Sequence, residues 1–264
     1  MTFATANATP IARTIPIAPV RARAHGNVVA PLQTGCSTCH LRDLCLPCGL
    51  TGSDTERLDQ LMFGRRKVAA GQTIYHAGDK FQFIYAVRSG TFKSSLMLAG
   101  GREQVSGFHM AGELMGLDAI ANGAHVSSAT ALEDSELCAI QYSHLNELAT
   151  QSSNLQMAMA QLMSREIVRE HSLMMLLGSM NAEERLAAFL LNISQRLKAR
   201  GYSSSEFHLR MSRAEIGSYL GMKLETVSRT FSAFQQQGLV QVDKKHVRIT
   251  DLERLGCTFE ARVH

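Results

Sequence analysis

The stretch that most constrains the fold is Asn154–Leu177, which contains neither glycine nor proline and is rich in methionine, leucine and alanine. Residues of these types are good helix formers, and nothing in the stretch breaks a helix, so one long helix is predicted. The parts of the chain before and after such a helix must each bury a core of their own. With 264 residues and 45% apolar content, two folded domains are expected.

The part before the long helix has the pattern of an antiparallel β structure. Short β-prone runs such as Phe83–Val87 and Thr91–Leu98 alternate with glycine-containing turns about every ten residues up to Ile140. This spacing is typical of a roll or barrel. The turn signals are Gly71, Gly78-Asp79, Ser89-Gly90, Gly100-Gly101, Gly112 and Asn122-Gly123.

The part after the long helix contains a helix–turn–helix pattern over Ser212–Gln237. Ser212 and Glu215 have the spacing of a helix-capping box, and Gly221 permits a tight turn before a second helix at Lys223–Gln236. A helical run, Ala182–Lys198, precedes this pattern, and a β-prone wing, Val240–Ile249, follows it.

The second helix of this pattern has two different faces. Leu224, Val227 and Phe231 are expected to point inward, with Phe234 near the edge. On the outer face, Arg229 can donate two hydrogen bonds to a guanine edge, and Glu225 can accept one from cytosine. An ordinary helical hairpin with a Glu225–Arg229 surface pair is the alternative. The candidate DNA-binding residues are Ser212, Arg213, Lys223, Glu225, Thr226, Ser228 and Arg229.

Charge favours the DNA-binding interpretation. From Arg196 to Arg248 there are ten Lys and Arg residues against four acidic ones, although the net charge of the whole chain is only +4. A basic module of this kind is expected of a protein that binds the phosphate backbone of double-stranded DNA. No nucleophile–base pattern and no phosphate-binding glycine loop is present, so the chain is not expected to be an enzyme.

Four cysteines are clustered near the start of the chain, with the spacing Cys36-x2-Cys39-x5-Cys45-x2-Cys48. Zinc sites usually separate their two pairs by a dozen residues or more, whereas an iron–sulfur cluster also accepts a thiolate from a distant segment. Spacing alone leaves a cluster, zinc and redox-active thiols open. Two further cysteines, Cys138 and Cys257, lie far downstream, and Cys138 falls in a strand-like run.

Residues 1–34 contain no acidic residue and are rich in Ala, Thr, Pro and Arg. This composition is found in organelle transit peptides, but a disordered extension is preferred. No stretch reaches the roughly 18 apolar residues of a membrane span, so a cytoplasmic protein without membrane contact is expected. The expected organisation is an extension (1–34), a cysteine-rich segment (35–50), a β-roll (51–150), a dimerisation helix (151–178) and a DNA-binding domain (179–264).

From Gly35 onward, the chain resembles the FNR (fumarate and nitrate reduction regulator) branch of the cyclic-AMP-receptor/FNR transcription factor family. The matching stretches are long and ordered. They include Leu44–Pro47, Arg88–Thr91, Gly107–His109, Asn181–Phe189, Ile216–Gly221 and Glu225–Arg229.

The resemblance implies an α+β fold: an N-terminal jelly-roll β-barrel like that of cyclic-nucleotide-binding domains, a long dimerisation helix and a C-terminal winged helix–turn–helix. By position, it places the ligands of a [4Fe-4S] cluster on Cys36, Cys39, Cys45 and Cys138. Cys48 departs from the family pattern, so a swap of ligands stays open. The implied function is oxygen-responsive regulation of anaerobic-metabolism genes, by a homodimer that forms while the cluster is intact. Its partners would be an inverted TTGAT repeat and RNA polymerase.

Cyclic nucleotide is not expected as a ligand. Gly112-Glu113 matches the start of the family's nucleotide-binding segment, but Ser127 stands where an arginine should hold the cyclic phosphate. A buried phosphate without its bidentate cation is poorly held.

The long helix also carries a coiled-coil pattern, which suggests how dimerisation is controlled. The seam residues, spaced 4, 3, 4 and 3, are Met163, Ile167, Glu170, Met174 and Leu177. Two Glu170 carboxylates facing each other would oppose pairing. Glu170 is therefore expected to hold the cluster-free protein near its monomer–dimer balance, unless it lies solvated at the seam edge beside Arg169.

Overall fold

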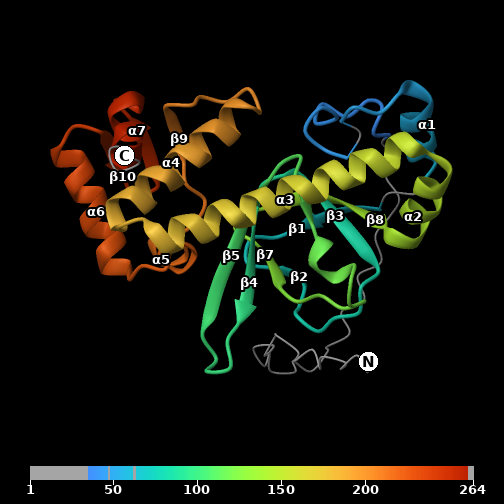
Figure 1. Ribbon diagram of the computed structural model, residues 1–264, viewed down its shortest axis with the longest axis horizontal. Helices are drawn as coiled ribbons and strands as arrows, with labels where there is room; N and C mark the ends of the chain where they lie inside the picture. Colours follow the sequence, from blue (N-terminus) through green and yellow to red (C-terminus); the bar gives the residue numbers. More distant parts are fainter. Residues whose placement is uncertain (1–34, 47, 62–63, 261–264) are drawn as a thin grey trace, which may run out of the picture.

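The computed structural model describes residues 35–46, 48–61 and 64–260, so the extension expected at residues 1–34 lies outside it. The long helix α3 (Ser153–Ser179) crosses most of the molecule, with the β structure along one side of it and the C-terminal domain at its far end (Figure 1). The prediction of a single long helix is confirmed, and Ser152 caps its start by accepting a hydrogen bond from Leu155 N at 3.2 Å.

The β structure is a jelly roll made of two four-stranded antiparallel sheets. One sheet has the order β1-β8-β3-β6 and the other β2-β7-β4-β5. The strands are β1 (Gly64–Val68), β2 (Thr73–Tyr75), β3 (Phe83–Ser89), β4 (Thr91–Met97), β5 (Glu103–Met110), β6 (Leu114–Met115), β7 (Ser128–Ala131) and β8 (Ser135–Gln141), with a short 3-10 helix, η1 (Leu117–Ala119).

Each of the six turn signals places a glycine in the left-handed region of backbone space, where a side chain is strained. These glycines are Gly71, Gly78, Gly90, Gly101, Gly112 and Gly123, with φ between 69° and 90°. At Gly90 a side chain would also collide with Ser135 at the start of β8. The local sequence therefore fixes where the chain reverses, and so the lengths of the strands.

The roll is flanked by two helices that were not predicted from the sequence. They are α1 (Gly52–Gln60) and α2 (Tyr142–Gln151), and both pack at the N-terminal end of α3 (Figure 1). The carboxylate of Asp54 in α1 accepts hydrogen bonds from Ser152 Oγ at 2.8 Å and from Asn154 Nδ2 at 2.9 Å. These bonds hold the segment that follows the cysteines against the start of the long helix.

The C-terminal domain is a winged helix–turn–helix. Its elements are α4 (Ala182–Lys198), β9 (Glu206–His208), α5 (Arg213–Leu220), α6 (Leu224–Gln236), β10 (Val240–Asp243), β11 (His246–Ile249) and α7 (Leu252–Glu260). The predicted helix at 182–198 and the two helices of the motif are confirmed. Strand β9 joins β10 and β11 in a three-stranded wing, and neither β9 nor α7 was predicted.

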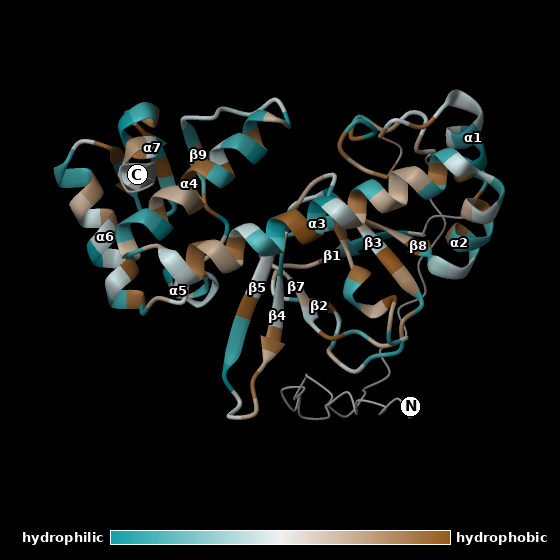
Figure 2. Ribbon diagram, viewed as in Figure 1, coloured by the Kyte–Doolittle hydropathy of each residue, from teal (hydrophilic) through white to brown (hydrophobic). Residues whose placement is uncertain are grey.

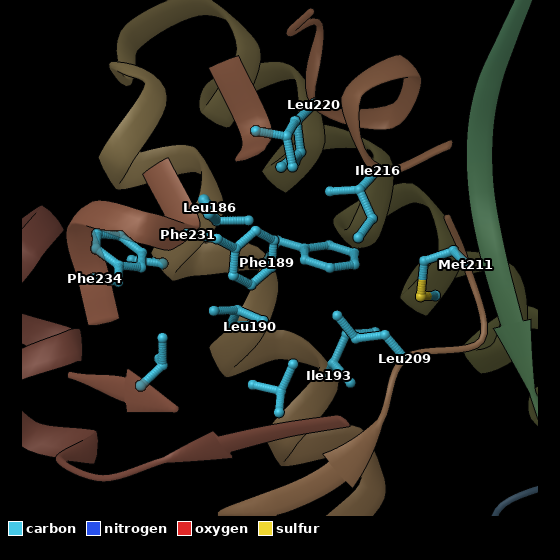
Figure 3. Packing of buried hydrophobic residues seen from close by; sticks show 14 of the residues in the cluster. Leu186, Phe189, Leu190, Ile193, Leu209, Met211, Ile216, Leu220, Phe231 and Phe234 are labelled. Carbon is cyan, nitrogen blue, oxygen red and sulfur yellow. The ribbon is translucent and has the colours of Figure 1, made fainter. Parts of the chain in front are cut away.

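Side chains from α4, α5 and α6 fill the core of this domain, with Phe189 near its centre (Figure 3). Two expectations about α6 are wrong. Phe234, expected near the edge, is completely buried, and Leu224, expected to point inward, is 47% exposed. Complete burial of a phenylalanine stabilises the fold by roughly 1.5–3 kcal/mol, so Phe234 is a main anchor of α6.

The C-terminal domain is bound to both the roll and the long helix. Ser218 Oγ of α5 accepts a hydrogen bond from Val105 N of β5 at 2.9 Å, and Lys93 of β4 contacts Glu215 at 3.3 Å. Arg185 of α4 donates to the carbonyl oxygens of Leu177 and Leu220 at 2.7 and 3.0 Å. Among the described residues, no helix is long and apolar enough to cross a membrane.

Candidate metal centre and nucleic-acid interface

The structure brings the four predicted cluster ligands to one cavity. Cys138 lies on β8, which confirms that its strand-like run forms a strand. The other three cysteines come from the cysteine-rich segment. The remaining walls are formed by Gly35, Arg42, Leu46, Ala86, Arg88 and Ile140, and Cys48 is not among the lining residues.

Successive tight turns shape the cysteine-rich segment. Cys39 N donates to Cys36 O at 3.2 Å, and Cys45 N donates to Leu41 O at 2.9 Å. Leu46 is 2% exposed and packs into the apolar core formed by the roll, α1, α2 and α3, where Cys45 and Cys138 also pack. The turns therefore present the three thiols to β8, and Leu46 holds the segment against the roll.

The thiols lie close enough to influence one another. Burial raises the pKa of Cys36 and Cys138 and raises that of Cys45 to about 12, and the neighbouring thiols raise all three further. A site that disfavours thiolates in this way needs a positively charged core to hold them. Cys36, Cys45 and Cys138 therefore differ from exposed reactive thiols, and a cationic group beside them would be needed for them to bind as thiolates.

Arg88 of β3 is a functional candidate that the sequence analysis missed, although it lies in a stretch quoted for the family resemblance. Its Nη1 donates a hydrogen bond to Cys39 Sγ at 3.9 Å, and Glu136 holds the guanidinium at 3.4 Å. Its charge lowers the pKa of Cys138, against the effect of burial. Arg88 thus places a fixed positive charge beside the cysteines that are predicted to be cluster ligands.

The cavity itself is small, about 30 Å³, which is room for roughly one water molecule. Around a single zinc ion, four sulfur ligands lie about 3.8 Å apart. Among the described residues, no three His, Cys, Asp or Glu side chains are arranged to hold one ion. An inorganic cube tolerates more widely spaced sulfurs. The donor set fits it, provided that the cysteine-rich segment, which forms one wall, moves outward.

The candidate DNA-binding residues of α6 lie on its outer face. Ser212 and Glu215 form the predicted capping box at α5, with Glu215 N donating to Ser212 Oγ at 3.2 Å and Ser212 N donating to Glu215 Oε2 at 2.7 Å. Lys223 is the N-cap of α6. In the first turns of α6, Lys223, Leu224, Glu225, Ser228 and Arg229 are exposed and Thr226 is partly exposed. Within the described residues Glu225 and Arg229 form no ion pair, so both are free to contact a partner.

Arg213 has a different environment from the other candidate DNA-binding residues. Its guanidinium lies 3.3 Å above the centre of the Phe231 ring, and burial lowers its pKa to about 10, so it stays charged at neutral pH. Its Nη1 is buried without a hydrogen-bond partner in the described structure. Arg213 therefore packs α5 against α6, and its contact with DNA stays a prediction.

The predicted seam of α3 is mostly exposed. Met163, Ile167 and Met174 are 40%, 55% and 61% exposed, and Figure 2 shows apolar positions along this helix. Glu170 lies between them, and partial burial and Glu166 both raise the pKa of its carboxyl. Leu177 differs, because it already packs against the core of the C-terminal domain. The free part of the seam therefore ends near Met174.

A second cavity, of about 630 Å³, lies between the roll and α3. Ser127 Oγ, at the position where a phosphate-binding arginine is absent, donates to the Asp118 carboxylate at 2.9 Å. Glu113 is occupied by Arg196 and Arg200, at 2.6 Å each. This cavity thus offers a carboxylate where a cyclic phosphate would need a cation.

Known proteins match the chain in both domains. Residues 65–152 match the family model of the cyclic nucleotide-binding domain, and residues 184–257 match that of the Crp-like helix-turn-helix domain. The transcriptional regulatory protein btr of Bordetella pertussis is 47% identical over 227 residues, covering 86% of this chain and 94% of that protein.

The fumarate and nitrate reduction regulatory protein of Escherichia coli K12 is 41% identical over 234 residues, covering 87% of this chain and 94% of that protein. Among solved structures, FixK2 from Bradyrhizobium japonicum has a TM-score of 0.69 and 29% identity, covering 74% of this chain and 96% of that chain. The alignments to these relatives span both the roll and the helix–turn–helix. The chain therefore belongs to the Crp/FNR family of transcription regulators, resembles its fumarate and nitrate reduction regulatory proteins, and is not an enzyme.

Proposed function

We propose that this regulator senses oxygen through a [4Fe-4S] cluster held by Cys36, Cys39, Cys45 and Cys138. The observation that carries the proposal is the single cavity bordered by these four cysteines, three from one segment and one from β8. The resemblance to the family implies that the bound cluster supplies an oxygen-labile inorganic core. Shared ligation would join the cysteine-rich segment to the roll, and loss of the core would release that segment.

The test is metal analysis of protein purified without air. We expect about four iron atoms and about four sulfides per chain, because a cube contains that number of each. Exposure to air should remove them and lower DNA affinity in the same sample. One zinc per chain, or metal-free protein whose DNA binding responds to thiol oxidation, would instead support a zinc- or thiol-redox-responsive regulator on the same scaffold.

The resemblance to the family supports the rest of the proposed role. The cluster-loaded protein is a cytoplasmic homodimer that binds an inverted TTGAT repeat, contacts RNA polymerase and activates or represses anaerobic-metabolism genes. Two α6 helices in one dimer reach half-sites about one helical turn apart. Cyclic nucleotide is not its ligand, because Asp118 and Ser127 replace the cation that a cyclic phosphate requires.

Glu170 sets the monomer–dimer balance in this proposal. Across a parallel pair of α3 helices, two carboxylates about 6 Å apart repel by about 3 kcal/mol at an effective dielectric constant near 20. We expect Glu170→Ala to tighten dimerisation of the cluster-free protein by roughly 100-fold. Sedimentation in air should then show a dimer where the unaltered protein is monomeric.

Glu170→Asp is the matched control, because it keeps the negative charge at the same seam position. It should stay monomeric in air, as the unaltered protein does. An aerobic Glu170→Ala monomer would show that Glu170 lies solvated at the seam edge, outside the contact between the two helices.

A further inference from the structure

Glu113 lies in the turn between β5 and β6 and joins the roll to the helix that begins the C-terminal domain. Its side chain is only 12% exposed. Arg196 of α4 donates from Nη2 to Glu113 Oε2 at 2.6 Å and from Nε to Oε1 at 3.0 Å. Arg200 Nη2 donates to Oε1 at 2.6 Å. Arg169 of the long helix lies 3.8 Å away, so this one carboxylate bridges three parts of the molecule.

Arg196 of α4 and Arg200, in the turn that follows α4, are also bound to the backbone of β5 and of the turn after it. Arg196 Nη2 donates to Phe108 O at 2.6 Å, and Arg200 Nε donates to Ala111 O at 2.7 Å. The arginines lower the pKa of Glu113 to about 2, against the effect of burial, so the carboxylate is charged throughout the physiological range. Removing one partner of such a cluster leaves a charge without compensation in a largely buried place. The turn and α4 therefore move together.

The same turn is in contact with the cysteine-rich segment. Gly112, next to Glu113, has φ of 88°, and a side chain there would place its Cβ 2.8 Å from Leu44 Cβ. Leu44 directly precedes Cys45, and Leu44, Gly112 and Glu113 line one cavity of about 290 Å³ together with the arginines. The cavity among the cysteines is too small for a cube unless this segment moves. A shift of Cys45 would therefore change the packing of Leu44 on Gly112.

We propose that Glu113 is the positioning residue that passes the state of the cysteine-rich segment to the DNA-binding domain. The route runs from Leu44 to Gly112, from Glu113 to Arg196 and Arg200, and so to α4. The same helix supplies Leu186, Phe189 and Leu190 to the core that holds α5 and α6 (Figure 3). The inference rests on the proposed function only for the signal, which is the cluster that moves the cysteine-rich segment. The contacts that transmit this movement are independent of the proposed function.

The first test compares Glu113→Gln with a matched control, Glu133→Gln. Glu133 also joins the roll to the C-terminal domain, through Arg210 at 3.1 Å, but that pair is half-exposed. We expect Glu113→Gln to keep its iron and its dimer while DNA affinity of the cluster-loaded form falls roughly 5- to 150-fold. The difference in DNA affinity between the cluster-loaded and the cluster-free protein should shrink to the same extent. Glu133→Gln should retain the full difference.

The second test needs no cluster. Hydrogen exchange of α4 is measured in cluster-free protein with Leu44→Ala, alone and combined with Glu113→Gln. Leu44→Ala alone should speed exchange in α4 several-fold, and in the Glu113→Gln background it should add nothing, because the connection is already broken. Should Glu113→Gln fail to fold, Arg200→Lys gives the same comparison, since it keeps the charge and loses the paired geometry.

The inference would be overturned if Glu113→Gln and Glu133→Gln had the same effect on DNA affinity. It would also be overturned if Leu44→Ala and Glu113→Gln had additive effects on hydrogen exchange in α4. The two proposals fail separately. If the unaltered protein holds no iron when prepared without air, the proposed function is wrong, while the exchange measurement still decides the role of Glu113.

Discussion

Cys138→Ser should lose almost all of its iron after anaerobic reconstitution, whereas Cys48→Ser should retain about four iron atoms per chain. Cys138 borders the same cavity as Cys36, Cys39 and Cys45, and Cys48 does not. A serine hydroxyl is a poor replacement for a thiolate ligand, so three remaining thiolates hold the core weakly. Iron and sulfide analysis measures both variants under the same conditions.

The same pair of variants tests the connection between the cluster and DNA. Cys138→Ser should remain in the low-affinity state without air, while Cys48→Ser should respond to air as the unaltered protein does. The reverse pattern, with iron lost from Cys48→Ser and kept by Cys138→Ser, would mean that the departure from the family pattern at Cys48 marks a swap of ligands. Loss of iron from both would indicate that Cys48 supports the segment without lining its cavity.

Arg229→Ala should weaken binding to a TTGAT half-site by about 1–3 kcal/mol, or roughly 5- to 150-fold per half-site. Arg229 is exposed in the second turn of α6, and Glu225 does not neutralise it. A guanidinium in this position can donate two hydrogen bonds to a guanine edge. The loss should therefore be largest on the intact site and almost disappear once the G·C pair has been replaced.

Lys223→Ala is the control for Arg229→Ala. Lys223 lies at the N-cap of α6, where a lysine contacts phosphate more readily than a base edge. This variant should lose affinity to a similar extent on every sequence and should reduce the dependence of binding on salt. If Arg229→Ala loses affinity equally on all sequences, Arg229 contacts the DNA backbone and does not read the base pair.

The positions of helices and turns were largely predictable, because local sequence determines them. The helix at 182–198 has the predicted bounds, and the capping box of Ser212 and Glu215 forms as its spacing indicated. The glycines predicted to turn the chain in the roll do so with positive φ. Each of these features depends on residues that lie within a few positions of one another.

The site was predictable only in part. Spacing left zinc and a cluster both open for the first cysteines, and it was the family resemblance that pointed to Cys138. The structure brings Cys138 to the other three, since pairing with β1 and β3 places β8 beside the cysteine-rich segment. Arg88 was missed because nothing in its own sequence context indicates that its guanidinium reaches a sulfur 49 residues away in the chain.

The sequence by itself determined the order of roll, long helix and helix–turn–helix, the bounds of α4 and the polar outer face of α6, since hydrophobic periodicity and capping are local properties. Only the tertiary structure decided that Phe234 is core and Leu224 is not, that Leu177 is already occupied within its own chain, and that Glu113 meets Arg196. The last two residues are 83 positions apart, and each alone has the sequence context of a solvated charge. Contacts of this kind depend on how whole domains pack, and no local pattern contains that information.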